Sequence, residues 1–254
     1  MLRAVIFDMD ETLIDWSNRV ENWGRQSRKM ITPVYEYLTE AGYALPPIGD
    51  FTQHYRNQNS LAWKAASPPE WRSPRLDQIF IKTLEALRVD SKGINIEEML
   101  RHFKWEVIPG VVPYNDTITV LKTLRKAGLK TGLVTNAALP MWMRDIELES
   151  MGLLDLLDER LTAGDVHHLK PHPKPFEVIM ERLGVTADEA VFVGDRLRDD
   201  VIGAQGVGMR GVWMRQATSE FFEDITPDAT LYTLSGLLGE LDGWFPGWRE
   251  NGNA

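Results

Sequence analysis

The sequence predicts an α/β protein, in which a parallel β-sheet is covered by helices on both faces and a separate helical domain is inserted after the first strand. Two observations carry this prediction. Short runs of β-branched and aromatic residues, typical of strands buried in a parallel sheet, alternate with segments of helical periodicity. Residues 16–106, which lie between the first run and all the others, show helical pattern and no convincing strand.

Four runs predict strands of the sheet. The first, Val5-Ile6-Phe7, is apolar on both faces and stops at a carboxylate. The other three span residues 130–135, 190–195 and 211–214. Helical periodicity fills residues 117–127 and 175–183, and each of these segments is followed by a glycine, a common residue just beyond a helix end. This alternation of strands and helices favours a parallel sheet.

The segment from residue 16 to 106 differs in composition and periodicity from the rest of the chain. It contains several tryptophans and the proline pairs Pro46-Pro47 and Pro68-Pro69. The loop at residues 108–113 would return the chain to the sheet. We therefore expect an α/β domain formed by residues 1–15 and 107–254, and a helical domain formed by residues 16–106.

Composition narrows the class of protein. The chain has 254 residues, with 28 Lys and Arg against 37 Asp and Glu, a formal charge of −9 that disfavours nucleic-acid binding. It has no cysteine, which excludes disulfides, thiolate metal sites and a cysteine nucleophile. No apolar run has the length of a membrane span, and residues 1–7 do not resemble a secretory signal. We expect a cytoplasmic protein without a membrane or nucleic-acid partner.

Polar groups follow three of the predicted strands at the point where each strand ends. Asp8 and Asp10 follow the first strand, Thr135 and Asn136 end the second, and Asp195 ends the third. Ligands bind beyond the carboxyl ends of the strands in open parallel sheets, so these groups would meet in one crevice. Taken singly, each is a common turn, cap or surface residue, and the convergence is the informative feature.

The two neighbouring carboxylates Asp8 and Asp10 would repel each other unless a cation lies between them. In a chain without cysteine, a hard divalent cation with oxygen ligands is the natural choice, and further oxygens come from Asp195 and the pair Asp199-Asp200. Magnesium suits a set of carboxylates completed by substrate phosphate oxygens. The candidate for a positively charged side chain in the same crevice is Lys170.

Four segments together carry a family resemblance. They are Phe7-Asp8-Met9-Asp10-Glu11-Thr12-Leu13, Val134-Thr135-Asn136, Lys170-Pro171-His172-Pro173 with Phe176, and Val193-Gly194-Asp195 through Asp199-Asp200-Val201. In this order they resemble the four motifs of the haloacid dehalogenase-like hydrolase superfamily, in particular members with a helical cap inserted after the first motif. Pro109-Gly110-Val111 is similar to the usual return from cap to core. The resemblance covers nearly the whole chain and implies a Rossmann-like core with a helical cap domain.

The resemblance also implies roles for individual residues. Asp8 would attack phosphorus and form an aspartyl phosphate, and Asp10 would protonate the leaving oxygen and later activate water. Lys170 would offset the charge on Asp8 and on the phosphoryl group. Thr12, Thr135 and Asn136 would contact the substrate. Mg²⁺ would be held by Asp8, Asp10 and Asp195, with Asp199 and Asp200 as further candidates.

The activity implied in this way is hydrolysis of a small phosphate monoester, a phosphorylated metabolite, by a magnesium-dependent phosphatase. A phosphomutase with the same core residues is the first alternative. A haloacid dehalogenase is the second, although dehalogenases of this fold lack the aspartate corresponding to Asp10. A non-catalytic binding module is the third. Glu11 and Arg196 depart from the family pattern, which often has Gly and Ser there, and both border the expected site.

Three weaker patterns carry other interpretations. His167, His168 and His172 lie close to Lys170 and could suggest zinc, but adjacent histidines point in different directions and no fourth ligand is evident. Arg25, Arg28 and Lys29 could recognise an acidic group of the substrate or form a solvated helix face. The nine tryptophans favour buried or interface positions over a ligand cage. The sequence leaves the substrate and the oligomeric state open.

Overall fold

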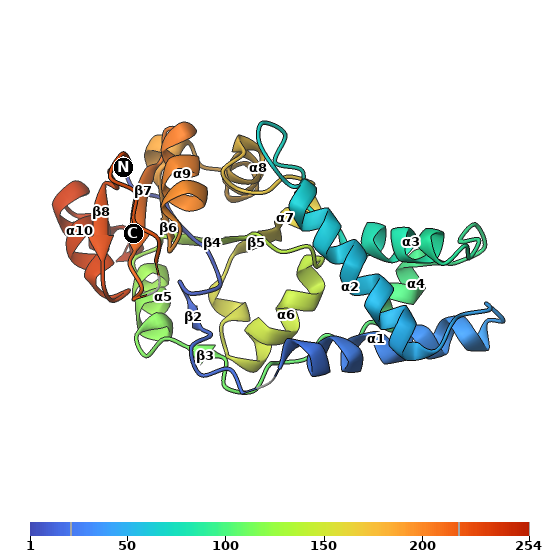
Figure 1. Cartoon of the computed structure of the whole chain (residues 1–254). Coiled ribbons are helices and arrows are strands. Elements are labelled where there is room, and N and C mark those ends of the chain that lie inside the picture. The colour runs from blue at the N-terminus through green and yellow to red at the C-terminus, as the bar shows by residue number, and fades with distance from the viewer. Residues whose placement is uncertain (21, 218, 254) are drawn as a thin grey trace.

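The computed structural model describes residues 1–20, 22–217 and 219–253. Its centre is a six-stranded sheet with the strand order β5-β4-β1-β6-β7-β8, in which every neighbouring pair is parallel (Figure 1). The strands are β1 (Ala4–Phe7), β4 (Lys130–Thr135), β5 (Glu159–Thr162), β6 (Ala190–Gly194), β7 (Arg210–Met214) and β8 (Ala229–Leu231). Because β1 lies between β4 and β6, the carboxyl ends of these three strands are neighbours.

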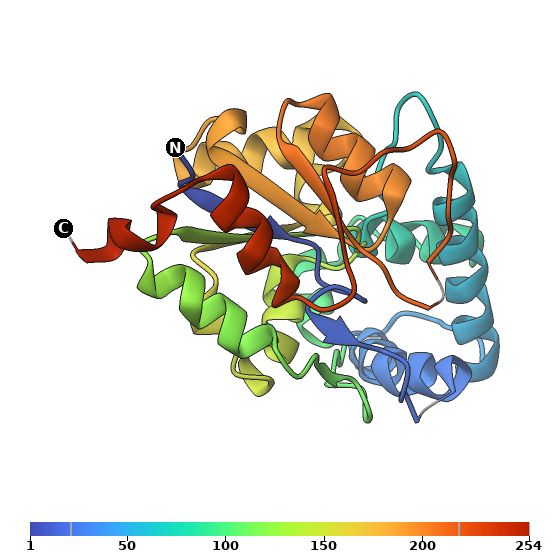
Figure 2. The ribbon, with the colours of Figure 1, turned by 90° about the vertical axis from the view of Figure 1, so that its left-hand side faces the viewer.

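Helices cover both faces of the sheet, as the alternation of side chains along β1 requires (Figure 2). Val5 and Phe7 belong to the larger apolar cluster, which includes side chains of α5 (Thr117–Lys126), α6 (Met141–Ser150) and α10 (Gly236–Trp244). Ala4 and Ile6 point to the opposite face, where α8 (Pro173–Leu183) and α9 (Ile202–Gly206) pack. Shorter helical segments lie between these elements: η1 (Leu154–Leu156), α7 (Ala163–Val166), η2 (Ala187–Glu189) and η3 (Leu197–Val201). A further one, η4 (Trp248–Asn253), follows α10.

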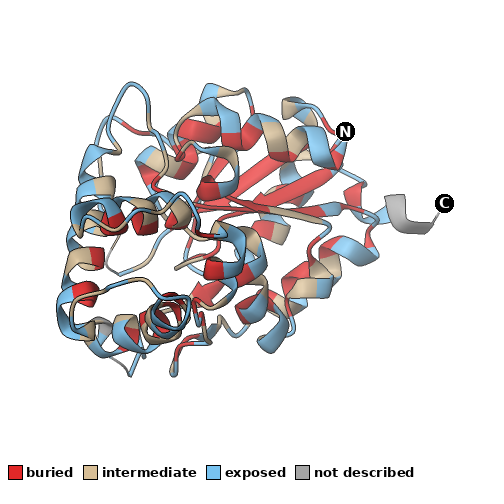
Figure 3. Cartoon of the chain, turned by 90° about the vertical axis from the view of Figure 1, so that its right-hand side faces the viewer, coloured by how far each residue is buried: buried red, intermediate tan, exposed pale blue. Residues whose placement is uncertain are grey.

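A helical region lies to one side of the sheet and contains α1 (Trp23–Glu40), α2 (Ile48–Ala65), α3 (Leu76–Ala86) and α4 (Ile96–Arg101) (Figure 1). The two-stranded antiparallel pair β2 (Ile14–Asp15) and β3 (Val112–Pro113) stands where the chain leaves the sheet and returns to it. Buried residues, red on the ribbon of Figure 3, occur in both regions. Apolar side chains from both regions belong to one continuous cluster. The assignment of residues 16–106 to a cap domain remains a prediction.

Backbone hydrogen bonds tie this helical region to the loop that carries Lys170. The Ser73 N–H donates to the His167 carbonyl at 3.1 Å, and the Leu169 N–H donates to the Trp71 carbonyl at 2.7 Å. At the start of α3, the Leu76 N–H donates to the Ala138 carbonyl at 3.0 Å. The loop between α2 and α3 therefore rests on the same segments that follow β4 and precede α8.

The predicted fold class is confirmed, and each of the four predicted strands is present. The helices predicted at 117–127 and 175–183 are α5 and α8, and both following glycines adopt positive φ, 76° at Gly128 and 65° at Gly184. The sequence analysis missed β5, β8 and the β2–β3 pair. β5 and β8 lie at the two edges of the sheet and are short and partly polar, so their local pattern is weak. No helix in the described part of the chain has the length and apolar character of a membrane span.

Candidate active site

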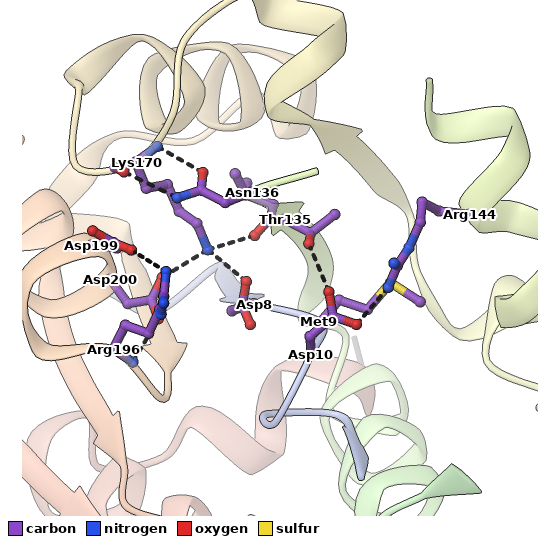
Figure 4. A network of polar contacts seen from close by, with 11 residues as sticks. Asp8, Met9, Asp10, Thr135, Asn136, Arg144, Lys170, Arg196, Asp199 and Asp200 are labelled. Atoms are coloured by element: carbon purple, nitrogen blue, oxygen red, sulfur yellow. Dashed lines mark hydrogen bonds and ion pairs between the residues drawn. The ribbon is translucent and has the colours of Figure 1, made fainter. Parts of the chain in front are cut away.

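Asp8 and Lys170 form the centre of the site (Figure 4). Asp8 directly follows β1, and its backbone N–H donates to the Val193 carbonyl on β6 at 2.9 Å. The buried Lys170 ammonium donates to Asp8 Oδ1 at 2.7 Å and to the Val134 carbonyl at 2.8 Å. It also forms an ion pair with Asp200 Oδ1 at 2.7 Å. One ammonium thus binds a carbonyl of β4 and the carboxylates that follow β1 and β6.

Asn136 holds the backbone of Lys170 in place. Its Oδ1 accepts from the Lys170 N–H at 2.8 Å, and its Nδ2 donates to the Lys170 carbonyl at 3.0 Å. Both ends of the amide are therefore used within the protein. The sequence analysis assigned Asn136 to substrate binding, which stays a prediction. In the structure, its amide fixes the backbone of the lysine that contacts Asp8.

The acidic residues after β6 occupy two different positions. Asp200 is buried, and its Oδ2 accepts from the Arg196 N–H at 2.9 Å. A Cβ at position 194 would lie 2.2 Å from that Oδ2, so the close approach of Asp200 requires Gly194. Asp199 instead pairs with the exposed guanidinium of Arg196 at 2.8 Å. Asp200 is thus directed at Lys170, and Asp199 is not.

The pKa values of these groups reflect crowded carboxylates. Burial raises the pKa of Asp8 to about 7; Lys170 opposes this effect, and Asp200 and Asp10 add to it. Burial, together with repulsion from Asp8 and Asp200, raises the pKa of Asp195 to about 8. Burial alone would lower the pKa of Lys170, but Asp200 and Asp8 outweigh it and raise that pKa above its ordinary value. One ammonium does not neutralise this set of carboxylates.

Asp8, Asp195 and Asp200 offer oxygens that all lie within 4.8 Å of one another. Three carboxylates with an uncompensated charge fit a hard divalent cation, which prefers oxygen ligands. The predicted ligands Asp8 and Asp195 belong to this group, while Asp199 does not, and no histidine of the described residues joins it. The His168 and His172 rings stack at 4.1 Å between centroids, and His172 Nδ1 accepts from the Lys174 N–H at 3.1 Å, so His172 acts as a helix cap.

Asp10 has different surroundings from Asp8 and lies on the side of Asp8 that faces Arg144, away from Lys170 (Figure 4). Its Oδ1 accepts from Arg144 Nη2 at 2.6 Å and from Trp16 Nε1 at 2.8 Å. Its Oδ2 lies 3.5 Å from the Thr135 hydroxyl. The sequence analysis missed Arg144 and Trp16 as site residues. A usable signal for Arg144 was a basic residue among apolar neighbours in the segment after Thr135-Asn136.

The two predicted threonines are both buried. Thr135 ends β4 beside Asp10, as the strand-end argument requires. Thr12 has no exposed surface, and its hydroxyl has no hydrogen-bond partner among the described residues. Contact of Thr12 with a substrate stays a prediction, and it would need a movement of neighbouring groups.

Two cavities between the helical region and the sheet meet at this centre. One, of about 590 Å³, is lined by Asp10 and Arg144 from the sheet side and by side chains of α1, α2 and α3. The other, of about 650 Å³, is lined by Lys170, Asp195 and Asp199 and by two tryptophans of the helical region, Trp63 and Trp71. We call these the Asp10 cavity and the Asp195 cavity. Arg25 and Arg28 line neither of them, but a separate hollow of about 410 Å³.

The sequence pattern of the haloacid dehalogenase-like hydrolases matches residues 2–208. This range is most of the chain and includes every site residue described in this subsection. The chain belongs to the haloacid dehalogenase-like hydrolase family. The family membership predicted from four short motifs is therefore confirmed, and the protein is a hydrolase.

Individual relatives in the family agree with this assignment. A glyceraldehyde 3-phosphate phosphatase of Methanopyrus kandleri is 30% identical over 89% of this chain and 88% of its own length. The pyrophosphatase PpaX of Bacillus mycoides is 31% identical over 93% of this chain and 95% of its own length. A solved structure of a 2-haloacid dehalogenase from Pseudomonas syringae superposes with a TM-score of 0.62 at 25% identity, covering 96% of this chain and all (100%) of that chain.

Proposed function

We propose that this hydrolase is a magnesium-dependent phosphatase that cleaves a small organic phosphate monoester through an aspartyl phosphate. The observation that carries the proposal is the buried Asp8 carboxylate, held at Oδ1 by the Lys170 ammonium at the meeting point of three strand ends. The names of the two curated relatives, a phosphate-ester phosphatase and a pyrophosphatase, support hydrolysis at phosphorus.

Asp8 is the nucleophile of the proposed reaction. Its carboxylate attacks phosphorus, the bond from phosphorus to the ester oxygen breaks, and Asp10 donates a proton to the leaving alcohol. In the second step Asp10 takes a proton from water as the water oxygen attacks phosphorus. This releases inorganic phosphate and returns the Asp8 carboxylate, so that one water is consumed for each ester.

Lys170 and Thr135 serve both steps by stabilising charge. The buried Lys170 ammonium, which has three contacts, meets the negative charge that builds on the phosphoryl oxygens. Asn136 contributes indirectly because it fixes the lysine backbone. Phosphoryl transfer needs mostly positioning and charge neutralisation, which these residues supply.

Mg²⁺ is the proposed metal, and Asp8 and Asp195 are the side chains that would hold it, with the Asp10 carbonyl as a further oxygen. Asp200 has an oxygen within the same group, but both of its oxygens already bind Lys170 and the Arg196 N–H, so its role is to hold the lysine. When bound, the cation neutralises charge on the phosphoryl group.

The Asp10 cavity supports an organic leaving group over a second phosphate. The leaving alcohol must lie near Asp10, and the walls there include many apolar and aromatic side chains: Met30, Ile31, Tyr55, Leu76, Ile79, Phe103 and Trp105. Arg144 lines the cavity but is already paired with Asp10 and Glu147, which leaves Arg56 as the lining cation that no carboxylate of the described residues pairs with. The second phosphate of pyrophosphate would find little charge compensation here.

The test is phosphate release from a panel of phosphorylated metabolites and pyrophosphate, with and without Mg²⁺. We expect turnover of organic monoesters that requires Mg²⁺ and is lost in Asp8→Asn, while Asp116→Asn, a surface aspartate at the start of α5, stays active. Turnover that survives in Asp8→Asn would refute the assigned nucleophile. Isomerised phosphate esters instead of free phosphate would indicate a phosphomutase, and halide release from 2-chloropropionate a dehalogenase.

A further inference from the structure

We infer that Arg144 and Trp16 are positioning residues for Asp10: they hold its Oδ1, and thereby reserve Oδ2 as the oxygen that carries the proton to the leaving group. The inference rests on the proposed function, because it assumes that Asp10 is the general acid and base. It concerns two residues that lie outside the four motifs, one at the junction after β2 and one on α6.

The two donors approach Asp10 from different elements. Arg144 Nη2 lies 2.6 Å from Oδ1, and Trp16 Nε1 lies 2.8 Å from the same oxygen. Two donors on one carboxylate oxygen fix the rotation of the carboxyl plane, since a turn of the group would break both bonds. A hydrogen bond to a charged donor is also stronger than a neutral one.

Arg144 is itself held rigidly. It is buried, its Nε lies 3.0 Å from Oε2 of Glu147, and Glu147 is 0% exposed. The Arg144 guanidinium also lies 5.8 Å from the centre of the Trp105 ring and donates to the Met9 sulfur at 3.1 Å. A buried ion pair adds little net stability because desolvation offsets the attraction. Its value here is geometric: Glu147 aims the planar guanidinium at Asp10.

The second oxygen of Asp10 has the freedom that Oδ1 lacks. The Thr135 hydroxyl lies 3.5 Å from Oδ2, beyond an ordinary O–H···O bond. The Asp10 side chain is 36% exposed and lines the Asp10 cavity, where the leaving alcohol is expected. Oδ2 is therefore the oxygen that can meet the ester oxygen and later a water molecule.

The balance of the proton follows from this assignment. As the bond from phosphorus to the ester oxygen breaks, the proton on Oδ2 passes to that oxygen and leaves with the alcohol. In the second step a proton from the attacking water returns to Oδ2. Without Arg144 the carboxyl group keeps only the neutral donor Trp16 on Oδ1 and is held less firmly, so that both transfers become slower while attack by Asp8 is not directly affected.

Leaving groups of different basicity separate this role from others. An alkyl phosphate needs a proton on its leaving oxygen, whereas p-nitrophenyl phosphate does not, because p-nitrophenolate is a weak base. In Arg144→Met we expect the first step to fall ~10²–10⁴-fold with an alkyl phosphate, the usual contribution of general acid catalysis. With p-nitrophenyl phosphate we expect that step to persist and to give a burst of p-nitrophenolate, followed by slow hydrolysis of the aspartyl phosphate.

Matched variants keep the result interpretable. Arg160→Met removes a different arginine, which pairs with Asp145 on the same helix α6, and should leave both leaving groups unaffected. Arg144→Met leaves the buried Glu147 without its partner, which could destabilise the fold. The double variant Arg144→Met/Glu147→Leu removes both charges and so separates loss of the Asp10 contact from loss of the fold. Trp16→Phe should show the same leaving-group dependence as Arg144→Met, but with a smaller fall in the rate of the first step.

The inference fails if Arg144→Met slows the first step equally for both leaving groups without a burst, or if it changes neither. An equal loss would point to a structural or substrate-binding role. Activity in Asp8→Asn would instead contradict the proposed function, so that the two failures are distinct.

Discussion

Asp8 and Asp10 are two residues apart, yet the structure surrounds them in opposite ways. Asp8 shares one ammonium, Lys170, with Asp200, and Asp195 lies within the same group of carboxylates. Asp10 faces a guanidinium that a second carboxylate, Glu147, supports from behind. The Asp8 side therefore sets three carboxylates against one ammonium, whereas on the Asp10 side one guanidinium pairs directly with both carboxylates.

This difference separates two tasks that one short motif combines. An excess of carboxylates makes the Asp8 side a place for a cation and for phosphoryl oxygens that the cation holds. The guanidinium on the Asp10 side, which pairs with both carboxylates, holds an acid in one orientation without a metal. The comparison predicts that changes on the Asp8 side will alter metal dependence, and that changes on the Asp10 side will alter leaving-group dependence.

Removal of the Lys170 ammonium, which Asp8 and Asp200 share, should reduce activity more than any other change on the Asp8 side. In Lys170→Met we expect kcat to fall by ~10²–10³-fold or more, as when one charge-stabilising donor is lost from an active site. The melting temperature should also drop, because Asp8 and Asp200 would remain buried without a partner. Lys174→Met, an exposed lysine in the first turn of α8, is the control. Near-normal turnover of Lys170→Met at saturating Mg²⁺ would contradict this role.

Asn136→Ala tests whether this side chain positions Lys170 or binds substrate. Loss of two hydrogen bonds worth about 1 kcal/mol each predicts a fall in kcat of about 30-fold. KM should remain near its normal value, because both bonds go to the protein. Asn115→Ala, at an exposed position before α5, is the control. A large rise in KM with unchanged kcat would instead support the substrate-binding role predicted from the sequence.

The stability of the metal-free protein should depend on pH through the Asp8 side. The pKa values of Asp8 and Asp195, raised from 3.8 to about 7 and about 8, mean that the folded state keeps protons which the unfolded chain has lost. Stability therefore falls as pH rises from about 4 to 8, by several degrees in melting temperature.

Mg²⁺ should raise the melting temperature more at pH 8 than at pH 5.5, and Asp195→Asn should reduce both the pH slope and the effect of Mg²⁺. Differential scanning fluorimetry across this pH range measures all three quantities. If neither Mg²⁺ nor Asp195→Asn changed the dependence of the melting temperature on pH, Asp8 and Asp195 would not be the groups that cause it.

Arg196→Ser should have the smallest effect. The Arg196 side chain is 67% exposed and pairs with Asp199, and its contact with Asp200 comes from the backbone N–H, which serine retains. Since exposed ion pairs contribute about 0–1 kcal/mol, kcat/KM should stay within about fivefold of normal. A larger loss would show that this side chain acts on the substrate in the Asp195 cavity.

The central part of the fold and of the site was predictable from the sequence. β1, β4, β6 and β7 are short apolar runs, and their parallel pairing, though not their order in the sheet, was predicted from strand–helix alternation. Parallel strands bring their carboxyl ends to one edge, so the meeting of Asp8, Thr135 and Asp195 needed no knowledge of side-chain packing. The four motifs then led to the correct family.

Tertiary structure alone decided how each carboxylate is used. Arg144 reaches Asp10 across 134 positions of the chain. Its apolar neighbours and the nearby Glu147 are visible in the sequence, but the direction in which α6 turns the guanidinium, and Asp10 as its partner, are not. The use of the Asn136 amide on Lys170, and the cavities between α1–α3 and the sheet, likewise depend on packing between distant segments. Local sequence determines which backbone ends meet, because hydrogen-bonded strands allow few arrangements. The direction and partners of a side chain depend on every element that packs around it.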